Sequence, residues 1–231
     1  MKIAIIPARG KSKRILRKNI KPFNGKPIIA YSIEVAKQSK LFDDIIVTTD
    51  DEEIAAVAEQ FGANAPFRRP DELSDDFTPT IPVIKHAIEW YEANRSPIDY
   101  VCCIYATAPF VRTEDLIAGY NALSELNKSY AFPVTSFPFP IFRSVAISEQ
   151  GMTPVFPEHI LKRSQDLPEA YHDAGQFYWG TREAYLEEKP FFAEHSYPIV
   201  IPRYLVQDID TPEDWESAEI MNRSIIENRS R

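Results

Sequence analysis

The chain has 231 residues, 44% of them hydrophobic, and a formal net charge of −8 at pH 7. This length and hydrophobic content predict one compact α/β domain over residues 1–231. No apolar run reaches the roughly 18 residues that a membrane-spanning helix needs, and the negative balance argues against nucleic acid as the bulk partner.

The N-terminus and the cysteines bear on location. The first residues lack the basic segment and long apolar segment that together mark a secretory signal. Cys102 and Cys103 are adjacent in an expected strand, where neighbouring side chains point to opposite faces. We therefore expect neither a disulfide nor a cysteine metal site, which favours the reducing cytoplasm.

The first part of the chain alternates strand and helix. The expected strands and helices are residues 3–6, 27–39, 45–47 and 51–61. Asp50 should cap the second helix, with Glu53 at its third position. This spacing is typical of a parallel sheet with right-handed crossovers.

A polar, proline-broken loop at residues 68–80 comes next. Nearly every residue of the expected strand at 100–105 is apolar, as in a central parallel strand. Thr113 is the expected cap of the helix that follows this strand. The elements expected in this part are a helix at 81–94, a strand at 100–105, a helix at 113–126 and a strand at 130–134.

Periodicity weakens and prolines multiply between residues 136 and 170, so we expect a small excursion with a hairpin at 142–147. Excursions of this kind often pair subunits, which is a hypothesis here. A terminal helix should begin after Thr211, its expected cap. The elements expected between the excursion and that helix are residues 176–179, 181–187, 198–201 and 204–209.

Positive charge is concentrated at the start of the chain. Residues 1–26 hold nine Lys and Arg and no carboxylate, whereas the remaining residues carry 17 basic against 34 acidic side chains, a net charge of −17. A basic loop directly after the first strand of an α/β sheet lies where such sheets bind ligands. We interpret it as a polyphosphate pocket. Its cations are Arg9, Lys11, Lys13, Arg14, Arg17 and Lys18.

Two other interpretations of this loop compete with the polyphosphate pocket. A Lys/Arg-rich segment can be a nucleic-acid or localisation patch, although such patches are usually exposed tails and this one follows a core strand. Gly10-Lys11-Ser12 imitates the end of a Walker A loop, but Ile5 stands where that motif needs its first glycine.

Asp208-Ile209-Asp210 is the second candidate for chemistry. In an extended strand both carboxylates share one face, and two carboxylates with phosphate oxygens and waters suit Mg²⁺. The alternative is that Asp210 only supports the start of the next helix, and the spacing alone leaves both open.

These segments resemble a known family. Pro7-Ala8-Arg9-Gly10, Ser12-Lys13-Arg14, Arg17-Lys18-Asn19 and Asp208-Ile209-Asp210-Thr211 resemble signatures of the CMP-sialic acid synthetases (acylneuraminate cytidylyltransferases). Lys11 and Leu16 depart from residues common there, glycine and proline. A lysine at a position that needs positive φ would cost about 1–2 kcal/mol.

The resemblance implies a single nucleotidyltransferase-type, Rossmann-like α/β domain: a mainly parallel sheet with flanking helices and a small dimerisation excursion. It also implies Mg²⁺ on Asp208 and Asp210. Implied catalytic residues are Arg9, Lys13, Lys18 and Asp210. Implied nucleotide-binding residues are Ala8, Arg9, Gly10, Ser12, Asn19, Arg68, Thr78 and Thr80, with Arg69 the weaker candidate of the arginine pair.

Two further segments resemble the pseudaminic acid branch of this family: Tyr105-Ala106-Thr107-Ala108-Pro109 and residues 173–180, Asp-Ala-Gly-Gln-Phe-Tyr-Trp-Gly. Ala106 stands where sialic acid enzymes usually carry a glutamine. Its small side chain suits a deoxy, methyl-ended sugar. Trp179 and His86 fit the core, and His172 is open between sugar contact and loop support. Implied sugar-binding residues are Tyr105, Ala106, Arg163, Gln176, Tyr178, Phe191 and Phe192.

The implied reaction joins CTP to pseudaminic acid, giving CMP-pseudaminic acid and diphosphate for surface glycans or flagellin. The same reaction on N-acetylneuraminic, legionaminic or 3-deoxy-octulosonic acid is the nearest alternative, and a nucleic-acid-binding module is a remote one. A homodimer is expected, because Phe191-Phe192 is an aromatic pair in an expected loop and residues 137–147 resemble the family's dimerisation excursion.

Overall fold

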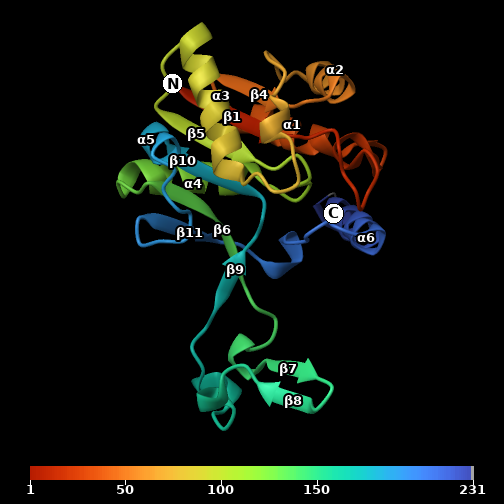
Figure 1. Ribbon diagram of the computed structural model, residues 1–231, viewed down its shortest axis with the longest axis vertical. Helices are drawn as coiled ribbons and strands as arrows, with labels where there is room; N and C mark the ends of the chain where they lie inside the picture. The colour runs from red at the N-terminus through yellow and green to blue at the C-terminus, as the bar shows by residue number, and fades with distance from the viewer. Residues whose placement is uncertain (230–231) are drawn as a thin grey trace.

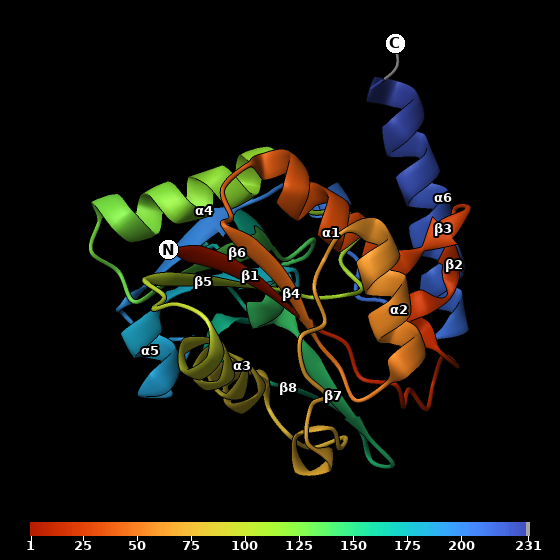
Figure 2. The same ribbon diagram turned by 90° about the horizontal axis from the view of Figure 1, so that it is seen from above.

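The computed structural model describes residues 1–229, and its centre is a seven-stranded sheet (Figures 1 and 2). The strand order is β11-β6-β10-β5-β1-β4, with β9 also paired to β6. β4, β1, β5, β6 and β11 run one way, while β9 and β10 run against them. The prediction of a mainly parallel sheet is confirmed.

The sheet strands are β1 (Lys2–Pro7), β4 (Asp44–Thr48), β5 (Tyr100–Ile104), β6 (Tyr130–Ser136), β9 (Tyr171–Asp173), β10 (Phe177–Thr181) and β11 (Ser196–Val200). The helices are α1 (Ile28–Ser39), α2 (Glu52–Phe61), α3 (Thr80–Asn94), α4 (Thr113–Glu125), α5 (Arg182–Leu186) and α6 (Pro212–Arg229). Two small hairpins are β2–β3 (Pro22–Phe23 and Lys26–Pro27) and β7–β8 (Val145–Ser148 and Gly151–Pro154). No helix in the described part of the chain is long and apolar enough to cross a membrane.

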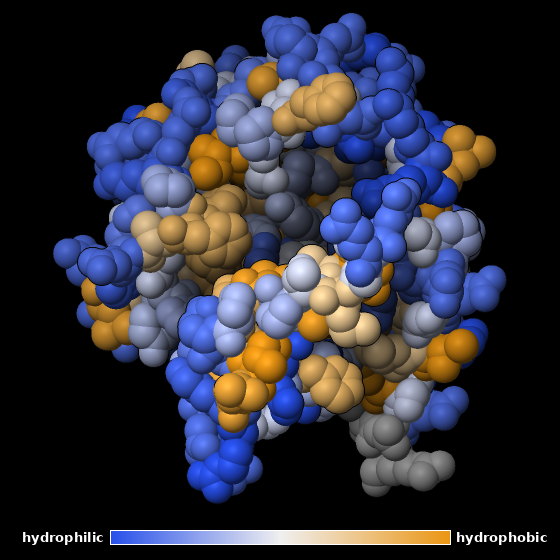
Figure 3. All heavy atoms as spheres, turned by 60° about the horizontal axis from the view of Figure 1, so that its bottom comes forward, coloured by the Kyte–Doolittle hydropathy of each residue, from blue (hydrophilic) through white to orange (hydrophobic). Residues whose placement is uncertain are grey.

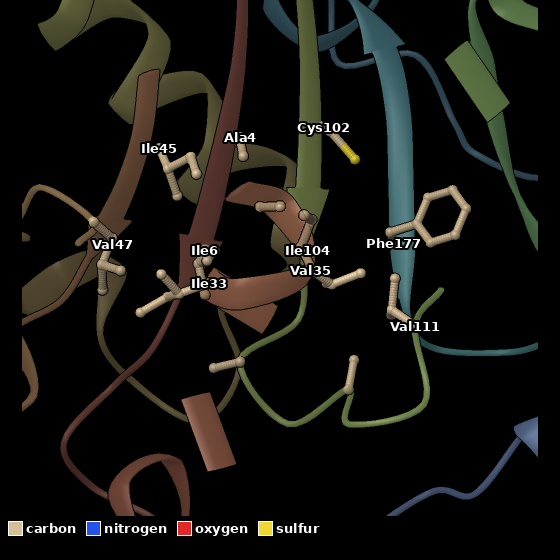
Figure 4. Close-up of a cluster of buried hydrophobic side chains, with 14 of the residues drawn as sticks. Ala4, Ile6, Ile33, Val35, Ile45, Val47, Cys102, Ile104, Val111 and Phe177 are labelled. Carbon is tan, nitrogen blue, oxygen red and sulfur yellow. The ribbon is translucent and has the colours of Figure 1, made fainter. Parts of the chain in front are cut away.

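Alternation along the strands builds a core on each face of the sheet. Ala4 and Ile6 of β1 face α1, α2 and α4 (Figure 4), whereas Ile3 and Ile5 face α3 and α5. The two cysteines follow the same rule, since Cys102 belongs to the first core and Cys103 to the second. Figure 2 shows the helices on both sides of the sheet.

A third, smaller core ties the two ends of the chain together. Ile15 from the basic loop and Ile209 from the acidic pair are both buried, and they belong to one cluster with Trp215 of α6. Burial of these apolar side chains therefore brings the cations near residues 13–18 to Asp210. This is how segments almost 200 residues apart meet at one site.

Residues 137–170 form an arm that projects from the sheet (Figure 1). Its hairpin is β7–β8, later than the predicted 142–147, because Ile141–Arg143 is a 3₁₀ turn after Pro138 and Pro140. All eight residues of β7 and β8 are exposed. The arm is thus a surface element with little core of its own.

Three local predictions need correction. The strand expected at 204–209 is wrong: Arg203–Leu205 is a 3₁₀ turn, and the Leu205 carbonyl accepts a hydrogen bond from the Gln176 side chain rather than from a neighbouring strand. Asp51, not Asp50, caps α2, and its carboxylate accepts from the Glu53 and Ile54 N–H groups.

Thr113 does not cap α4, since it already lies inside the first turn and makes no capping bond. At α6 the expected cap is confirmed. The Asp214 N–H donates to the Thr211 hydroxyl, and the Asp214 carboxylate accepts from the Thr211 N–H at 2.7 Å.

Candidate active site

The basic loop leaves β1 against the end of β4, and one glycine allows the close approach. The Gly10 N–H donates to the Asp50 carboxylate at 2.8 Å. A Cβ at this position would lie 2.6 Å from Asp51 Oδ2, so a side chain does not fit without a shift. The sequence Asp50-Asp51 therefore serves both the loop and the helix cap.

Arg17 fixes the far side of the loop. Its backbone is in the left-handed region at φ 54° and ψ 33°, a strained conformation for a non-glycine residue. Its guanidinium pairs with Asp51 and Glu53. The hydrogen bond to Asp51 is the largest cause of the raised pKa of Arg17 and of the lowered pKa of Asp51. We conclude that Arg17 shapes the loop.

A cavity of about 600 Å³ opens at the carboxyl ends of β1 and β5. It is bounded by the basic loop, by residues 69–83 and by Asp210, and Tyr105 and Thr107 form its other wall. Its lining residues are Pro7, Arg9, Ser12, Lys13, Arg14, Lys18, Asn19, Arg69, Leu73, Asp75, Asp76, Thr78, Thr80, Val83, Tyr105, Thr107 and Asp210.

Each cation of this lining has a carboxylate partner. Arg9 Nη1 lies 2.7 Å from Asp76, and Lys13 pairs with the same carboxylate. Lys18 Nζ and Arg14 Nη2 lie 3.2 and 2.8 Å from the Asp210 carboxylate.

Arg69 is the deepest cation of the site. Its side chain is only 4% exposed, Asp50 lies 3.8 Å away, and its Nε donates to the Ser74 hydroxyl at 3.0 Å. Burial lowers the pKa of the Arg69 guanidinium, against the opposing effect of Asp50. Arg69 is thus held rigidly at the cavity wall.

Most of the predicted nucleotide residues line this cavity: Arg9, Ser12, Lys13, Lys18, Asn19, Thr78, Thr80 and Asp210. Ala8 is buried beneath it, and Gly10 is used through its N–H. The order of the two arginines is reversed. Arg68 is exposed and outside the lining because its backbone bridges to Thr49, which turns Arg69 inward.

Lys11 and Leu16, the two departures from the family signature, lie away from the cavity. Both are exposed, and neither is among the residues with positive φ. The idea that Lys11 replaces a glycine under strain is therefore wrong, because its backbone conformation suits any residue.

Asp210 is the carboxylate that a divalent cation would meet in this cavity. The preceding residue, Ile209, is buried, and the Asp210 N–H donates to the Asp214 carboxylate at 3.1 Å. Asp208 is exposed and outside the lining. No group of three or more His, Cys, Asp or Glu within the described residues could hold a metal alone. One or two carboxylates completed by phosphate oxygens and waters match what Mg²⁺ prefers.

Tyr105 forms the cavity wall beyond the cations, and Tyr178 is buried behind it, outside the lining. The Tyr105 hydroxyl lies 3.0 Å from the Thr80 hydroxyl, and the Tyr105 and Tyr178 rings are 5.3 Å apart. The Tyr178 hydroxyl donates to Asp173. Burial is the main cause that raises the pKa of Tyr105 to about 12 and that of Tyr178 well above its usual value. Both phenols are therefore protonated donors at neutral pH.

A second, shallower cavity of about 270 Å³ lies beside Tyr178, between β6, β9 and residues 191–198. Phe191 and Phe192 line it with His172 and Asp173. The Phe191 ring stacks on Tyr178 at 4.6 Å, whereas Phe192 is 71% exposed. The aromatic pair thus divides, one ring packed in its own chain and the other on the surface.

Four of the predicted sugar residues line neither cavity, and one of them is Tyr178, which is buried with its hydroxyl on Asp173. Ala106 is buried, and Arg163 is on the arm, where it pairs with Asp166. Gln176 is 3% exposed and donates to the Leu205 carbonyl at 2.6 Å, so it links β10 to the segment before Asp208 instead of facing a cavity. Its role as a direct sugar contact is not supported.

With this geometry described, known proteins can be compared. A family model described as cytidylyltransferase matches residues 3–225. The chain belongs to the cytidylyltransferase family. It is therefore a nucleotidyltransferase, and enzymes of this kind generally use a divalent metal.

This cytidylyltransferase is 47% identical over 220 residues to a pseudaminic acid cytidylyltransferase of Campylobacter jejuni, covering 95% of both chains. It is 30% identical over 220 residues to a CMP-N,N′-diacetyllegionaminic acid synthase of Legionella pneumophila, covering 94% of each. A solved CMP:2-keto-3-deoxy-manno-octonic acid synthetase complexed with CTP superposes with a TM-score of 0.70 at 15% identity, covering 96% of this chain and 98% of the other. The last comparison shows the shared fold.

Sequence reasoning missed the acidic partners of this cytidylyltransferase's cations. Asp50, Asp51 and Asp76 contact the basic loop from 34 or more residues away along the chain. Thr107 was also missed as a lining residue. The available signal was the excess of carboxylates after residue 27, which must neutralise the loop somewhere in a folded domain.

Proposed function

We propose that the chain transfers the cytidylyl group of CTP to pseudaminic acid, releasing diphosphate. The observation that carries this proposal is one cavity that joins five cations at one end to the Tyr105 wall at the other. The 47% identity over 95% of a pseudaminic acid cytidylyltransferase supports this sugar. Use of CTP favours a cytoplasmic location.

The triphosphate would lie among the cations of the basic loop. Arg9, Lys13 and Lys18 would contact its oxygens and the departing diphosphate, since charged hydrogen bonds to phosphate are the strong ones. Thr78, and Thr80 at the start of α3, line the cavity, and their hydroxyl groups would contact the cytosine edge.

The reaction forms one bond and breaks another. The anomeric oxygen of the sugar would attack the α-phosphorus, the bond between the α-phosphorus and the bridging oxygen would break so that diphosphate leaves, and the hydroxyl proton would pass to water. Cations placed along the phosphates stabilise the charge that moves onto the diphosphate. Positioning and charge carry the step, with no covalent intermediate on the enzyme.

We propose Mg²⁺ as the divalent cation, held by Asp210 with Asp208. When bound, it would neutralise phosphate charge and lower the pKa of the attacking hydroxyl. Asp214 would keep Asp210 in place through the Asp210 N–H. Lys18 and Arg14, which pair with Asp210 in the free protein, would turn to phosphate oxygens.

The sugar would lie toward Tyr105 and Tyr178. The Tyr105 phenol is protonated, so it would donate a hydrogen bond to a carboxylate or carbonyl oxygen of the sugar and would not act as a base. The Tyr178 hydroxyl already donates to Asp173, so Tyr178 would support the Tyr105 ring.

We further propose a homodimer in which each site is completed by the other copy. Phe192 is 71% exposed, and the arm exposes Phe139, Ile147 and Leu161 by 80%, 84% and 98%. Figure 3, turned to bring the arm forward, shows hydrophobic side chains on this face. A second copy would cover them, and Arg163 of the arm would then reach a sugar carboxylate in its partner's site.

Pyrophosphate release tests the function. The protein with CTP and Mg²⁺ should release pyrophosphate with pseudaminic acid far faster than with N-acetylneuraminic, legionaminic or 3-deoxy-octulosonic acid, and ATP, GTP and UTP should be poor substitutes. Equal use of all four acids would refute the pseudaminic assignment. Release with none of them, from a folded protein that binds CTP, would refute the proposed transfer.

A further inference from the structure

The cation end of the nucleotide cavity already holds an anion, the Asp76 carboxylate. It accepts from Arg9 at 2.7 Å and from Lys13. Its side chain is 27% exposed, and it lines the cavity. The two cations that a polyphosphate would need are therefore paired within the protein.

Asp76 differs from the other two carboxylates of the cavity. The Asp75 carboxylate is used by its own turn, where it accepts from the Phe77 and Thr78 N–H groups at 2.9 and 2.7 Å. Asp210 is held between buried Ile209 and the start of α6. Asp76 and Asp210 each have only cations as described partners of their carboxylates. Asp76 differs because it lies on an exposed turn, whereas the Asp210 backbone N–H is bonded to Asp214.

The turn that carries Asp76 is closed on itself and attached to the basic loop by few contacts. In the described part of the chain, polar contacts between residues 75–79 and the basic loop come only from Arg9 and Lys13. Phe77, at the tip, is 90% exposed. Loss of those pairs would let the turn move while Ser74 and Thr80 hold its ends.

We propose that Asp76 is an internal counter-ion that the triphosphate displaces and that returns to Arg9 and Lys13 as pyrophosphate leaves. This inference rests on the proposed function for the identity of its ligand. A carboxylate and a phosphate cannot share the same two cations without strong repulsion. Displacing Asp76 costs the energy of its two ion pairs, so a ligand with more phosphate charge, such as a diphosphate or triphosphate, displaces it more readily than a monophosphate.

The exchange sets specificity and release together. It raises the amount of phosphate charge that a ligand needs in order to bind, which selects against nucleoside monophosphates. It also weakens retention of the diphosphate product, whose departure limits turnover in many enzymes. Asp76 thus determines which phosphate ligands bind, and it does so by lowering the affinity of the cavity for all of them.

Calorimetric binding of inorganic pyrophosphate in the presence of Mg²⁺ tests the exchange. Asp76→Asn keeps the shape and removes the charge, and we expect it to bind pyrophosphate about tenfold more tightly than the parent protein. Asp71→Asn is the matched control, since Asp71 is an exposed carboxylate of the same loop outside the cavity lining. The control should stay within about twofold, because exposed charges are screened by salt.

Phe77→Trp adds a readout of movement. Its emission should change when pyrophosphate saturates the parent background, and the change should shrink in the Asp76→Asn background, where the turn is already released. Asp76→Ser serves in place of Asn if thermal unfolding shows that the first variant is poorly folded.

The outcomes separate cleanly. The exchange would be overturned if Asp76→Asn bound pyrophosphate no more tightly than Asp71→Asn, or less tightly than the parent protein. It would also be overturned if the emission change of the Phe77→Trp protein were the same with and without the Asp76→Asn substitution. A parent protein that binds pyrophosphate but makes no CMP-sugar with any acid would refute the proposed function alone, and the exchange would still be measurable.

Discussion

The two ends of the site differ in whether their side chains find partners within the same chain. At the nucleotide end each cation of the lining has a carboxylate within the same chain, as Arg9 has Asp76 and Lys18 has Asp210. At the sugar end, Phe192 and much of the arm are apolar and exposed. A carboxylate of the same chain can pair with the cations that would otherwise bind phosphate. Exposed apolar side chains, in contrast, are removed from water only when another surface covers them. This difference fits the proposal that one chain builds the nucleotide end and that two chains build the sugar end.

Asp210→Asn should have the largest effect, because it removes the carboxylate proposed to hold the metal and keeps the side-chain volume. We expect near-complete loss of pyrophosphate release, with thermal unfolding unchanged. CTP binding without turnover should remain, since Lys18 and Arg14 are freed from their pairs. If the variant keeps activity near the parent level in Mg²⁺, Asp210 is not required for the reaction.

Lys18→Ala should weaken CTP binding by about 1.5–3 kcal/mol, the contribution of a charged hydrogen bond. Lys18 is 17% exposed and lines the cavity. Lys2→Ala removes the same charge from β1, where the ammonium lies over the Tyr120 ring instead. Equal losses in the two variants, measured by calorimetry, would mean that overall charge and not the cavity is responsible.

Replacing Phe191 and Phe192 one at a time should separate the ring that packs in its own chain from the ring that is exposed. Phe191→Ser removes a ring that stacks on Tyr178 and contacts Tyr130, so it should cost about 2 kcal/mol of stability, less than a fully buried phenylalanine. Phe192→Ser should leave stability and CTP binding nearly unchanged and raise KM for the sugar. A Phe192 variant as unstable as the Phe191 variant would show that both rings belong to their own chain's core.

Lys11→Gly should have the smallest effect of the series. Lys11 is exposed, outside the cavity and free of positive φ. Glycine should therefore destabilise the protein by about 0.5–1 kcal/mol through backbone entropy, with CTP affinity retained. A clear loss of CTP affinity without unfolding would show that the Lys11 ammonium contacts the phosphates in the CTP complex.

Periodicity in the sequence predicted most of the sheet, because β1, β4 and β5 are buried on both faces and are nearly all apolar. It failed at residues 204–209. Tyr204, Leu205 and Val206 have the composition of a strand, but β11 already forms the edge of the sheet beside β6, and the Leu205 carbonyl is bonded to a side chain. Whether a segment finds a strand partner depends on the whole sheet, and local composition does not contain that information.

The cationic half of the site was predictable because a loop after the first parallel strand must lie at a ligand-binding edge. Its carboxylates were not, since Lys18 and Asp210 are 192 residues apart and meet only through the cluster that buries Ile15 and Ile209. Arg69 was underrated for a similar reason. Only the pairing of its backbone with Thr49 decides which of two adjacent arginines points inward.

Subunit complementation tests most directly whether one chain builds the nucleotide end and two chains build the sugar end. Asp210→Asn and Phe192→Ser proteins are mixed, allowed to exchange subunits, and assayed at a sugar concentration where each alone is nearly inactive. A mixed dimer has one site with an intact Asp210 and the partner's intact Phe192. Activity should therefore recover to about a quarter of the parent value, because half of randomly paired dimers are mixed and each has one working site. Activity no higher than that of the two variants assayed separately would contradict the shared site.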